Sequence, residues 1–174
     1  MFKVLKQLRG TPPRCIRGFT ASPVPAPERD ARADSSAFRL ACLCRGEHGR
    51  VLGHSLADYS KEYDGPLEFI GPLGFGCGSC GKRTPVIDTD IHGWHGELGC
   101  SAVYRGRGRR QPYPCPQCGG DEFGVVVTFL YPDDAIGGEE DDLPAAREDS
   151  FSGFQLHGTC AGCDKRSWIA GFEL

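Results

Sequence analysis

Short apolar runs separated by glycine, proline and charged residues recur along residues 38–174. Four of these runs are rich in Val, Ile, Leu and Phe, and they occupy residues 50–56, 67–75, 123–131 and 151–159. Their length and their β-branched and aromatic content favour strands, and no stretch shows the spacing of an amphipathic helix. Two shorter runs, TPVIDTD from Thr84 and SWIAGFEL from Ser167, predict further strands. We therefore expect a small β-rich protein built from short antiparallel strands.

The same order of features occurs twice. Residues 38–98 and 113–174 align as two units, each with a cysteine pair, an apolar run, a polar insertion, a second apolar run, a second cysteine pair and a strand-like end. The second pairs and the residues after them are nearly identical, CGSCGKRT from Cys77 and CAGCDKRS from Cys160. Because each unit is too small to bury a large core alone, we expect each to need its own staple.

The cysteines can provide that staple. Eight of the ten cysteines fall in tight pairs, and two facing Cys-x-x-Cys turns form a tetrahedral four-cysteine zinc site with Zn–S bonds of ~2.3 Å. No secretory signal or membrane-spanning run is visible, so we expect a reducing, cytoplasmic location, in which metal binding is favoured over the alternative of disulfides. We predict two structural Zn²⁺ ions, one bound by Cys42, Cys44, Cys77 and Cys80 and one bound by Cys115, Cys118, Cys160 and Cys163.

The first pair of the first site departs from this spacing. A single residue separates Cys42 from Cys44, one fewer than in the other three pairs, and His48 follows four residues later. His48 is therefore an alternative ligand that could replace one thiolate. The competing interpretation is an exposed loop histidine.

The pairs CLC with CGSC and CPQC with CAGC resemble the zinc ribbon family, in which two cysteine turns crown a small three-stranded sheet. The resemblance covers most of residues 40–174 and implies a tandem double zinc ribbon. It implies the fold and the metal but no single function, since ribbons serve in transcription, translation, enzymes and protein contacts alike.

Residues 1–37 differ from the rest of the chain. The first 27 contain five basic residues and no acid, and the stretch SPVPAPERDARADSS from Ser22 has the composition of a linker. We expect a disordered tail here, with a transit peptide or a misassigned start as alternatives. The tail holds seven of the 20 Lys/Arg and three of the 23 Asp/Glu, so residues 38–174 carry a net charge of −7.

Two segments outside the cysteine pairs contain candidate binding residues. The stretch from Asp88 to Cys100 gathers Asp90, His92, Trp94, His95 and Glu97. With His92 and His95 as ligands and Glu97 as base, it could hold a catalytic metal. The alternatives are a contact loop built around Trp94 or an ordered linker, and the glycines in this stretch argue against a helix. The unpaired Cys100 and Cys15 are interpreted as spare thiols.

The second segment is the Gly/Arg-rich linker 99–112. Its arginines could track a phosphate backbone, although the acidic charge of the two units opposes long-range attraction. These arginines are Arg105, Arg107, Arg109 and Arg110.

The insertion 133–150 in the second unit is strongly acidic and could steer association with a basic protein. We therefore expect a non-catalytic zinc protein that acts through protein contacts, with an inhibitor-like or immunity-like role towards a basic partner. The alternative is a transcription-related, nucleic-acid-binding zinc ribbon that uses residues 105–110. We expect no membrane partner.

Overall fold

The computed structural model describes residues 11–27, 35–88, 106–131, 149 and 151–173. This part of the chain is β-rich and its strand pairs are antiparallel, as predicted. The short 3-10 turns η1 (Arg14–Ile16) and η3 (Leu56–Asp58) are its helical segments, and none of its helices is long and apolar enough to cross a membrane. The strands are β1 (Thr20–Val24), β2 (Ser35–Ala41), β3 (His48–Ser55), β4 (Phe69–Cys77), β5 (Arg83–Ile87), β6 (Gln111–Pro112), β7 (Phe123–Leu130), β8 (Gly153–Cys160) and β9 (Arg166–Glu173).

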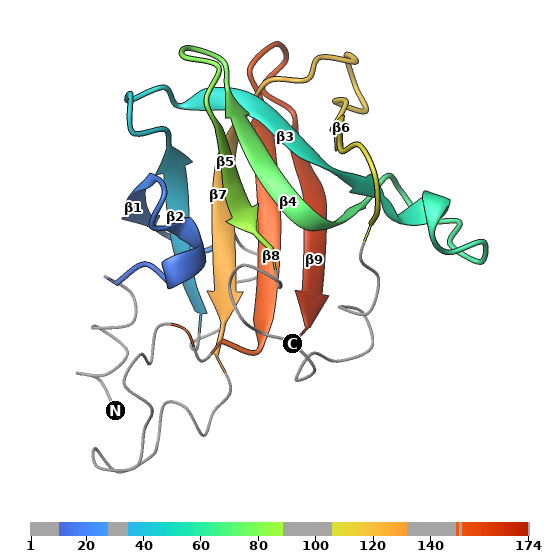
Figure 1. Ribbon diagram of the computed structural model, residues 1–174, viewed down its shortest axis with the longest axis horizontal. Coiled ribbons are helices and arrows are strands. Elements are labelled where there is room, and N and C mark those ends of the chain that lie inside the picture. The colour runs from blue at the N-terminus through green and yellow to red at the C-terminus, as the bar shows by residue number, and fades with distance from the viewer. Residues whose placement is uncertain (1–10, 28–34, 89–105, 132–148, 150, 174) are drawn as a thin grey trace.

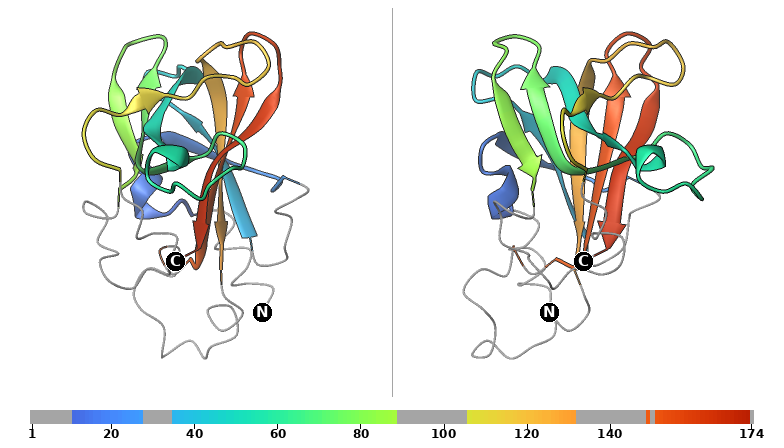
Figure 2. Two further views of the ribbon diagram at one scale, coloured as in Figure 1. Left: turned by 90° about the vertical axis from the view of Figure 1, so that its right-hand side faces the viewer. Right: turned by 45° about the vertical axis from the view of Figure 1, so that its right-hand side comes forward.

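The strands form two layers that share one hydrogen-bonded network (Figure 1). One layer has the order β1–β2–β7–β8–β9, and the other has the order β6–β3–β4–β5. Figure 2 shows the two layers from the side. They are joined where the first residues of β3 pair with the first residues of β7, through His48 with Gly124 and Gly49 with Phe123.

This topology preserves the repeat. Each unit contributes a three-stranded meander, β3–β4–β5 and β7–β8–β9, with its second cysteine pair in the last turn. Gly49 pairs with Cys77 and Phe123 pairs with Cys160, so Gly49 and Phe123 hold the same place in their units. These two residues also pair with each other. Contact between equivalent positions is the arrangement expected of two copies related by a local twofold axis.

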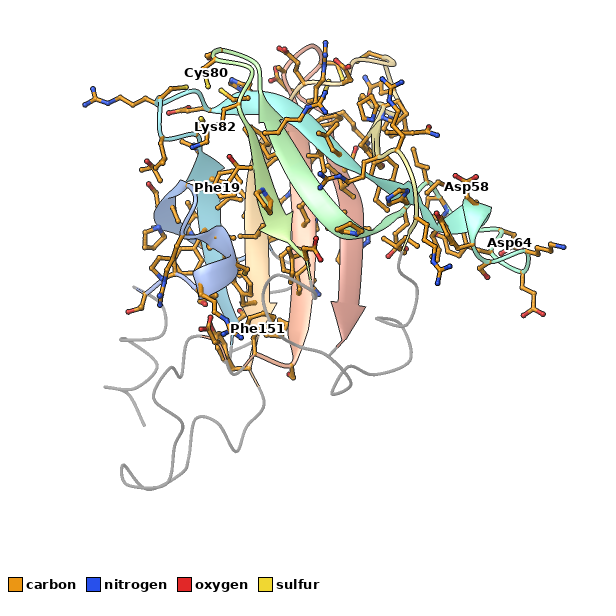
Figure 3. The ribbon with its side chains drawn as sticks, in the orientation of Figure 1. Phe19, Asp58, Asp64, Cys80, Lys82 and Phe151 are labelled. Atoms are coloured by element: carbon orange, nitrogen blue, oxygen red, sulfur yellow. The ribbon has the colours of Figure 1, made fainter. Side chains whose placement is uncertain are left out.

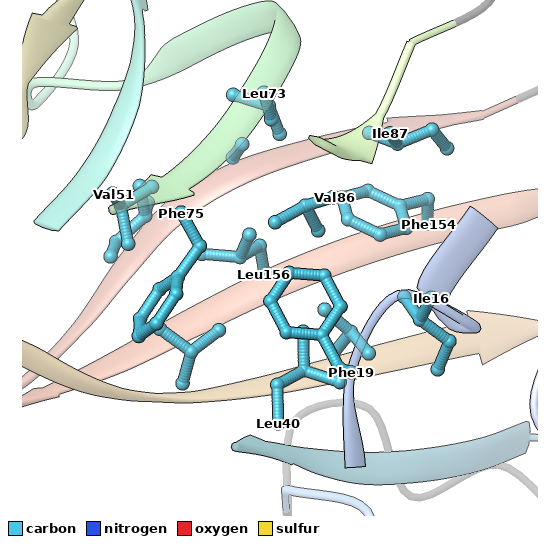
Figure 4. Packing of buried hydrophobic residues seen from close by; sticks show 14 of the residues in the cluster. Ile16, Phe19, Leu40, Val51, Leu73, Phe75, Val86, Ile87, Phe154 and Leu156 are labelled. Carbon is cyan, nitrogen blue, oxygen red and sulfur yellow. The ribbon is translucent and has the colours of Figure 1, made fainter. Parts of the chain in front are cut away.

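A single cluster of buried side chains fills the space between the layers. Alternate residues of β7 point into it, as a half-buried strand requires, and Phe123, Val125 and Val127 are fully buried. Leu73 and Phe75 of β4 enter the same cluster from the other unit (Figure 4). The two units therefore share their core within the described residues.

Tyr113 ties the two units together at one side of this core. Its ring packs edge-to-face against Phe69 at 5.2 Å and against Phe123 at 5.7 Å between ring centroids. Its hydroxyl oxygen lies 3.3 Å from the carbonyl oxygen of Leu67 in the first unit and 3.2 Å from that of Trp168 in the second.

The prediction of a disordered tail over residues 1–37 is wrong for residues 11–27 and 35–37. β1 pairs with β2 along its whole length, and β2 begins at Ser35. Ile16 is fully buried, and Phe19 packs edge-to-face against Phe75 with 5.9 Å between ring centroids. The basic, acid-free composition predicted a disordered segment here, but these apolar side chains close one side of the core (Figure 4).

Candidate metal centres

The second four-cysteine group lies where the turn before β7 meets the turn between β8 and β9. The backbone N–H of Cys115 donates to the carbonyl of Gly120 at 2.7 Å, and the N–H of Gly119 donates to the carbonyl of Cys115 at 2.8 Å. Gly119 closes the turn with φ of +75°, a left-handed conformation that glycine adopts at low cost. The Sγ atom of Cys115 lies 3.6 Å from that of Cys163, and those of Cys118 and Cys160 are 3.5 Å apart.

The first group reaches the same arrangement with a shorter turn. Here the N–H of Cys42 donates to the carbonyl of Gly46 at 2.8 Å, so the loop closes one residue earlier than its counterpart. Arg45, with φ of 73°, takes the left-handed place that Gly119 holds in the second group. The Sγ distances are 3.7 Å from Cys42 to Cys80 and 3.6 Å from Cys44 to Cys77. The missing residue changes the turn but not the sulfur cluster.

These distances suit a tetrahedral metal. A tetrahedron with metal–sulfur bonds of ~2.3 Å has edges of about 3.8 Å, whereas a disulfide requires about 2.05 Å between sulfurs. In each group the four sulfur atoms all lie within 4.8 Å of one another, so each group could hold a metal ion. The structure thus brings together the eight predicted cysteines, in the two predicted groups.

The two groups lie at the same end of the molecule. The β4–β5 turn, which contains Cys80 and Lys82, and the β8–β9 turn project from the same edge of the two layers (Figures 1 and 3). His48 does not belong to the first group, which consists of four cysteines. It is exposed, as the alternative interpretation predicted, but it lies at the start of β3 rather than in a loop, with its imidazole near Gly124.

The thiols of both groups are poised for a cation. Burial opposes ionisation of Cys77, but hydrogen bonds from the backbone N–H groups of Cys80 and Ser79 and from the thiols of Cys44 and Cys80 together outweigh it and lower the pKa of Cys77 to about 7. The pKa of Cys115 falls to about 7 for the same reasons, with donors from the second site's first turn. A hydrogen bond from the Gly46 N–H lowers the pKa of Cys44, but the three neighbouring thiols together outweigh it and raise that pKa to about 12. Without a cation, the four thiols cannot all ionise together at neutral pH.

Several predicted binding residues lie outside the described residues. They are Asp90, His92, Trp94, His95, Glu97 and Arg105, and the spare thiol Cys100 and the acidic insertion apart from Asp149 lie outside them too. The described Asp149 accepts a hydrogen bond from the backbone N–H of Arg14 at 2.8 Å, which anchors η1. Cys15 follows Arg14 in η1 and is buried, and burial raises the pKa of the Cys15 thiol.

The arginine segment that follows residue 105 is held against the first unit. The backbone N–H of Gly106 donates to the carbonyl of Gly71 at 2.9 Å, and a side chain at Gly106 would collide with the ring of His54. The N–H of Arg107 donates to the hydroxyl of Tyr59 at 2.6 Å. These contacts give the segment a defined position beside β3, whereas a simple linker between the units would not need such contacts.

The segment meets two arginines to which the sequence pattern assigned no binding role. Arg109 and Arg110 line an open cleft together with Arg50 of β3 and Arg83 of β5. The sequence signal for Arg50 and Arg83 was weak, because they precede Arg110 by 60 and 27 positions. They become its neighbours only when the sheet forms.

No protein-family model matches the chain, and no match was found among curated proteins or solved structures. The two four-cysteine groups are consistent with zinc-ribbon-like units, and the assignment rests on the geometry of the cysteines alone.

Proposed function

We propose that the protein binds two structural Zn²⁺ ions and acts as a non-catalytic binding domain. The observation that carries this proposal is the closed set of four sulfurs in each group, with neighbouring Sγ atoms 3.5 to 3.7 Å apart. Zinc accepts tetrahedral four-thiolate coordination with no further geometric demand. Four cysteine ligands leave no coordination position for water, which is the arrangement of structural rather than catalytic zinc.

The metal would hold the ends of the strands that build the shared core. Cys77 ends β4 and Cys160 ends β8, and each pairs across to the first residues of the neighbouring strand. Metal binding at these turns therefore supports strand pairing in both layers, and its free energy becomes part of the folding free energy.

Contact with another protein is the activity that we propose for this domain. The acidic insertion 133–150 supports this proposal through its charge, which suits a basic partner.

Chelation coupled to unfolding tests the zinc proposal. The purified protein is titrated with a zinc chelator while circular dichroism reports the β-structure and a zinc indicator reports the released metal. Two zinc ions should leave each chain, and the β-signal should collapse as they leave. The variant Cys163→Ser should release zinc from the second site at a lower chelator concentration, whereas Cys15→Ala, which keeps a buried apolar residue outside both sites, should release zinc at the same chelator concentration as the parent protein. Loss of all metal with the β-structure intact would refute a structural role.

A further inference from the structure

The cleft lined by Arg50, Arg83, Arg109 and Arg110 lies on the outer face of the β3–β4–β5 layer, beside the first four-cysteine group. Its volume is about 590 Å³, within the range of ligand-binding clefts. Val51 of β3 and Phe75 of β4 point into the core, so the residues that alternate with them, Arg50 among them, face this cleft.

The cleft concentrates positive charge on an acidic chain. Four arginines line it against one acid, Glu122. Asp121 forms an ion pair with Arg50, with 2.9 Å between Nε and Oδ2. Within the described part of the chain, the other three guanidinium groups have no carboxylate at ion-pair distance. They are available to an external anion.

The second unit shows that the fold does not require these arginines. A zinc ion with four thiolates carries a net charge of −2, and Lys82 with Arg83 could offset that charge at the first site. The second unit has the equivalent pair, Lys165 with Arg166, after its own last cysteine. Yet Gly124 stands where the first unit has Arg50, as the pairing of β3 and β7 with their neighbours shows. The remaining arginines thus exceed what the metal site needs.

The floor of the cleft differs between the units in the same way. Gly76 of β4 lines the cleft and Gly74 lies two residues before it on the same face, where β8 has Thr159 and His157 at the equivalent places. His157 packs edge-to-face on Trp168 with 5.1 Å between ring centroids, and these two side chains fill the corresponding space on the second unit. In the first unit the side chain of Arg110 occupies the space above Gly74, because a Cβ atom at Gly74 would lie 2.9 Å from the Nη1 atom of Arg110.

Glycine in a strand weakens the strand and is used where a ligand must approach the backbone closely. The contacts of Gly106 and Arg107 described above hold Arg109 and Arg110 over this floor. The binding surface is therefore organised before a ligand arrives, which lowers the cost of binding.

We propose that this cleft is a binding site for phosphate esters and that its ligand is single-stranded nucleic acid held by its phosphates. Guanidinium groups match phosphate oxygens with paired hydrogen bonds, and four of them surround one open floor. None of the described residues that line the cleft is aromatic, so contacts to phosphates rather than base stacking would dominate. This proposal adds a binding site to the zinc domain proposed above. It rests on that proposed function only because the cleft forms when the domain is folded.

Fluorescence anisotropy of a labelled oligothymidylate tests the proposal on the full chain loaded with zinc. Three or four phosphate contacts predict that the logarithm of the binding constant falls with the logarithm of salt concentration with a slope of about −2 to −3. Arg50→Gln and Arg110→Gln should each weaken binding roughly tenfold. The matched control is Arg166→Gln, which changes the equivalent of Arg83 in the second unit and should leave binding unchanged.

Gly76→Thr provides a second test that does not remove charge. A Cβ atom at Gly76 would meet its nearest neighbour, Leu52, at 3.8 Å, which is an ordinary van der Waals contact, and threonine is the residue that the second unit has at this place, Thr159. The variant should fold as stably as the parent but bind the oligonucleotide several-fold more weakly, because the threonine fills the floor. Equal binding by Gly76→Thr, Arg110→Gln and the control would overturn the proposed site.

Competition with a nucleoside triphosphate distinguishes the two sources of phosphate. If the triphosphate displaces the oligonucleotide only at millimolar concentrations, the ligand is the polymer; if it binds more tightly, phosphate-ester binding holds but nucleic acid as its ligand is overturned. A protein that contains two zinc ions yet binds neither probe in a salt-sensitive way overturns this inference alone. Arginine-dependent binding by a folded protein that contains no zinc overturns the zinc proposal alone.

Discussion

Replacing Phe123 by alanine should weaken both units, although the residue belongs to the second. Its side chain is fully buried, and it sits at the junction where β7 pairs with β3. A buried Phe→Ala change costs about 3 to 5 kcal/mol, because transfer energy is lost and a cavity is left. The edge-to-face contact with Tyr113 places the cost near the upper end. For a domain of this size the expected fall in Tm is about 10 to 15 °C.

Hydrogen exchange measured by NMR locates where this stability is lost. If the two units share one core, amides of β4 and β5 should lose protection to the same extent as those of β7 and β8. Urea denaturation should show a single transition with an unchanged slope and a lower midpoint. Leu43→Ala is the control, because an exposed side chain contributes within about 0.5 kcal/mol. Zinc content measured on the same sample shows whether the metal sites stay filled.

Loss of amide protection in the second unit alone would contradict this prediction. If β7 and β8 lost protection while β4 and β5 kept theirs, the two units would be independently stable, and the shared core would not carry the stability of the fold.

Three further predictions concern single features. Arg45→Gly should stabilise the protein by about 0.5 to 1 kcal/mol in urea denaturation, because it relieves a left-handed arginine, whereas Gly119→Ala should cost about 1 kcal/mol. Burial and Arg110 lower the pKa of His54, while Asp58 opposes the shift, so the unfolded chain binds a proton that the folded chain excludes. Stability should fall as pH drops through the unfolded pKa of about 6.5, and the fall in Tm from pH 7.5 to 6 should be smaller in His54→Gln; equal slopes would contradict this. Neutralising the acidic residues of the insertion 133–150 should slow association with a basic protein partner and flatten its salt dependence in surface-plasmon measurements, and an unchanged on-rate would count against a protein-contact role.

The strands and the cysteine groups could be predicted because their signals are local. The run from Phe123, rich in Val and Phe and short enough for a strand, indicates a buried strand directly. Cysteine pairs with near-identical following residues, as at Cys77 and Cys160, report on a repeated turn. Even the short pair from Cys42 was placed correctly in its group, because a turn can lose one residue when Arg45 adopts the left-handed conformation.

The features that were missed depend on contacts between distant residues. Ile16 and Phe19 stand singly among prolines and basic residues, so no periodicity marks them, and only the completed sandwich gives them a place in the core. The cleft is missed for the same reason, since Arg50 and Arg83 lie on strands of the first unit while Arg110 lies beyond it in sequence. Gly74 and Gly76 alone did not predict a cleft. Their role becomes visible only when they are compared with the equivalent residues of β8, His157 and Thr159.

Native mass spectrometry of the full chain tests the central claim most directly, namely that two four-cysteine groups each bind one structural zinc ion. The parent protein should carry two zinc ions. Cys44→Ser and Cys118→Ser should each weaken metal binding at one site, so that partial chelation leaves one ion, while Cys15→Ala should retain both. A mass that corresponds to no bound metal, to cysteines joined as disulfides, or to a third metal in the parent protein would contradict the account.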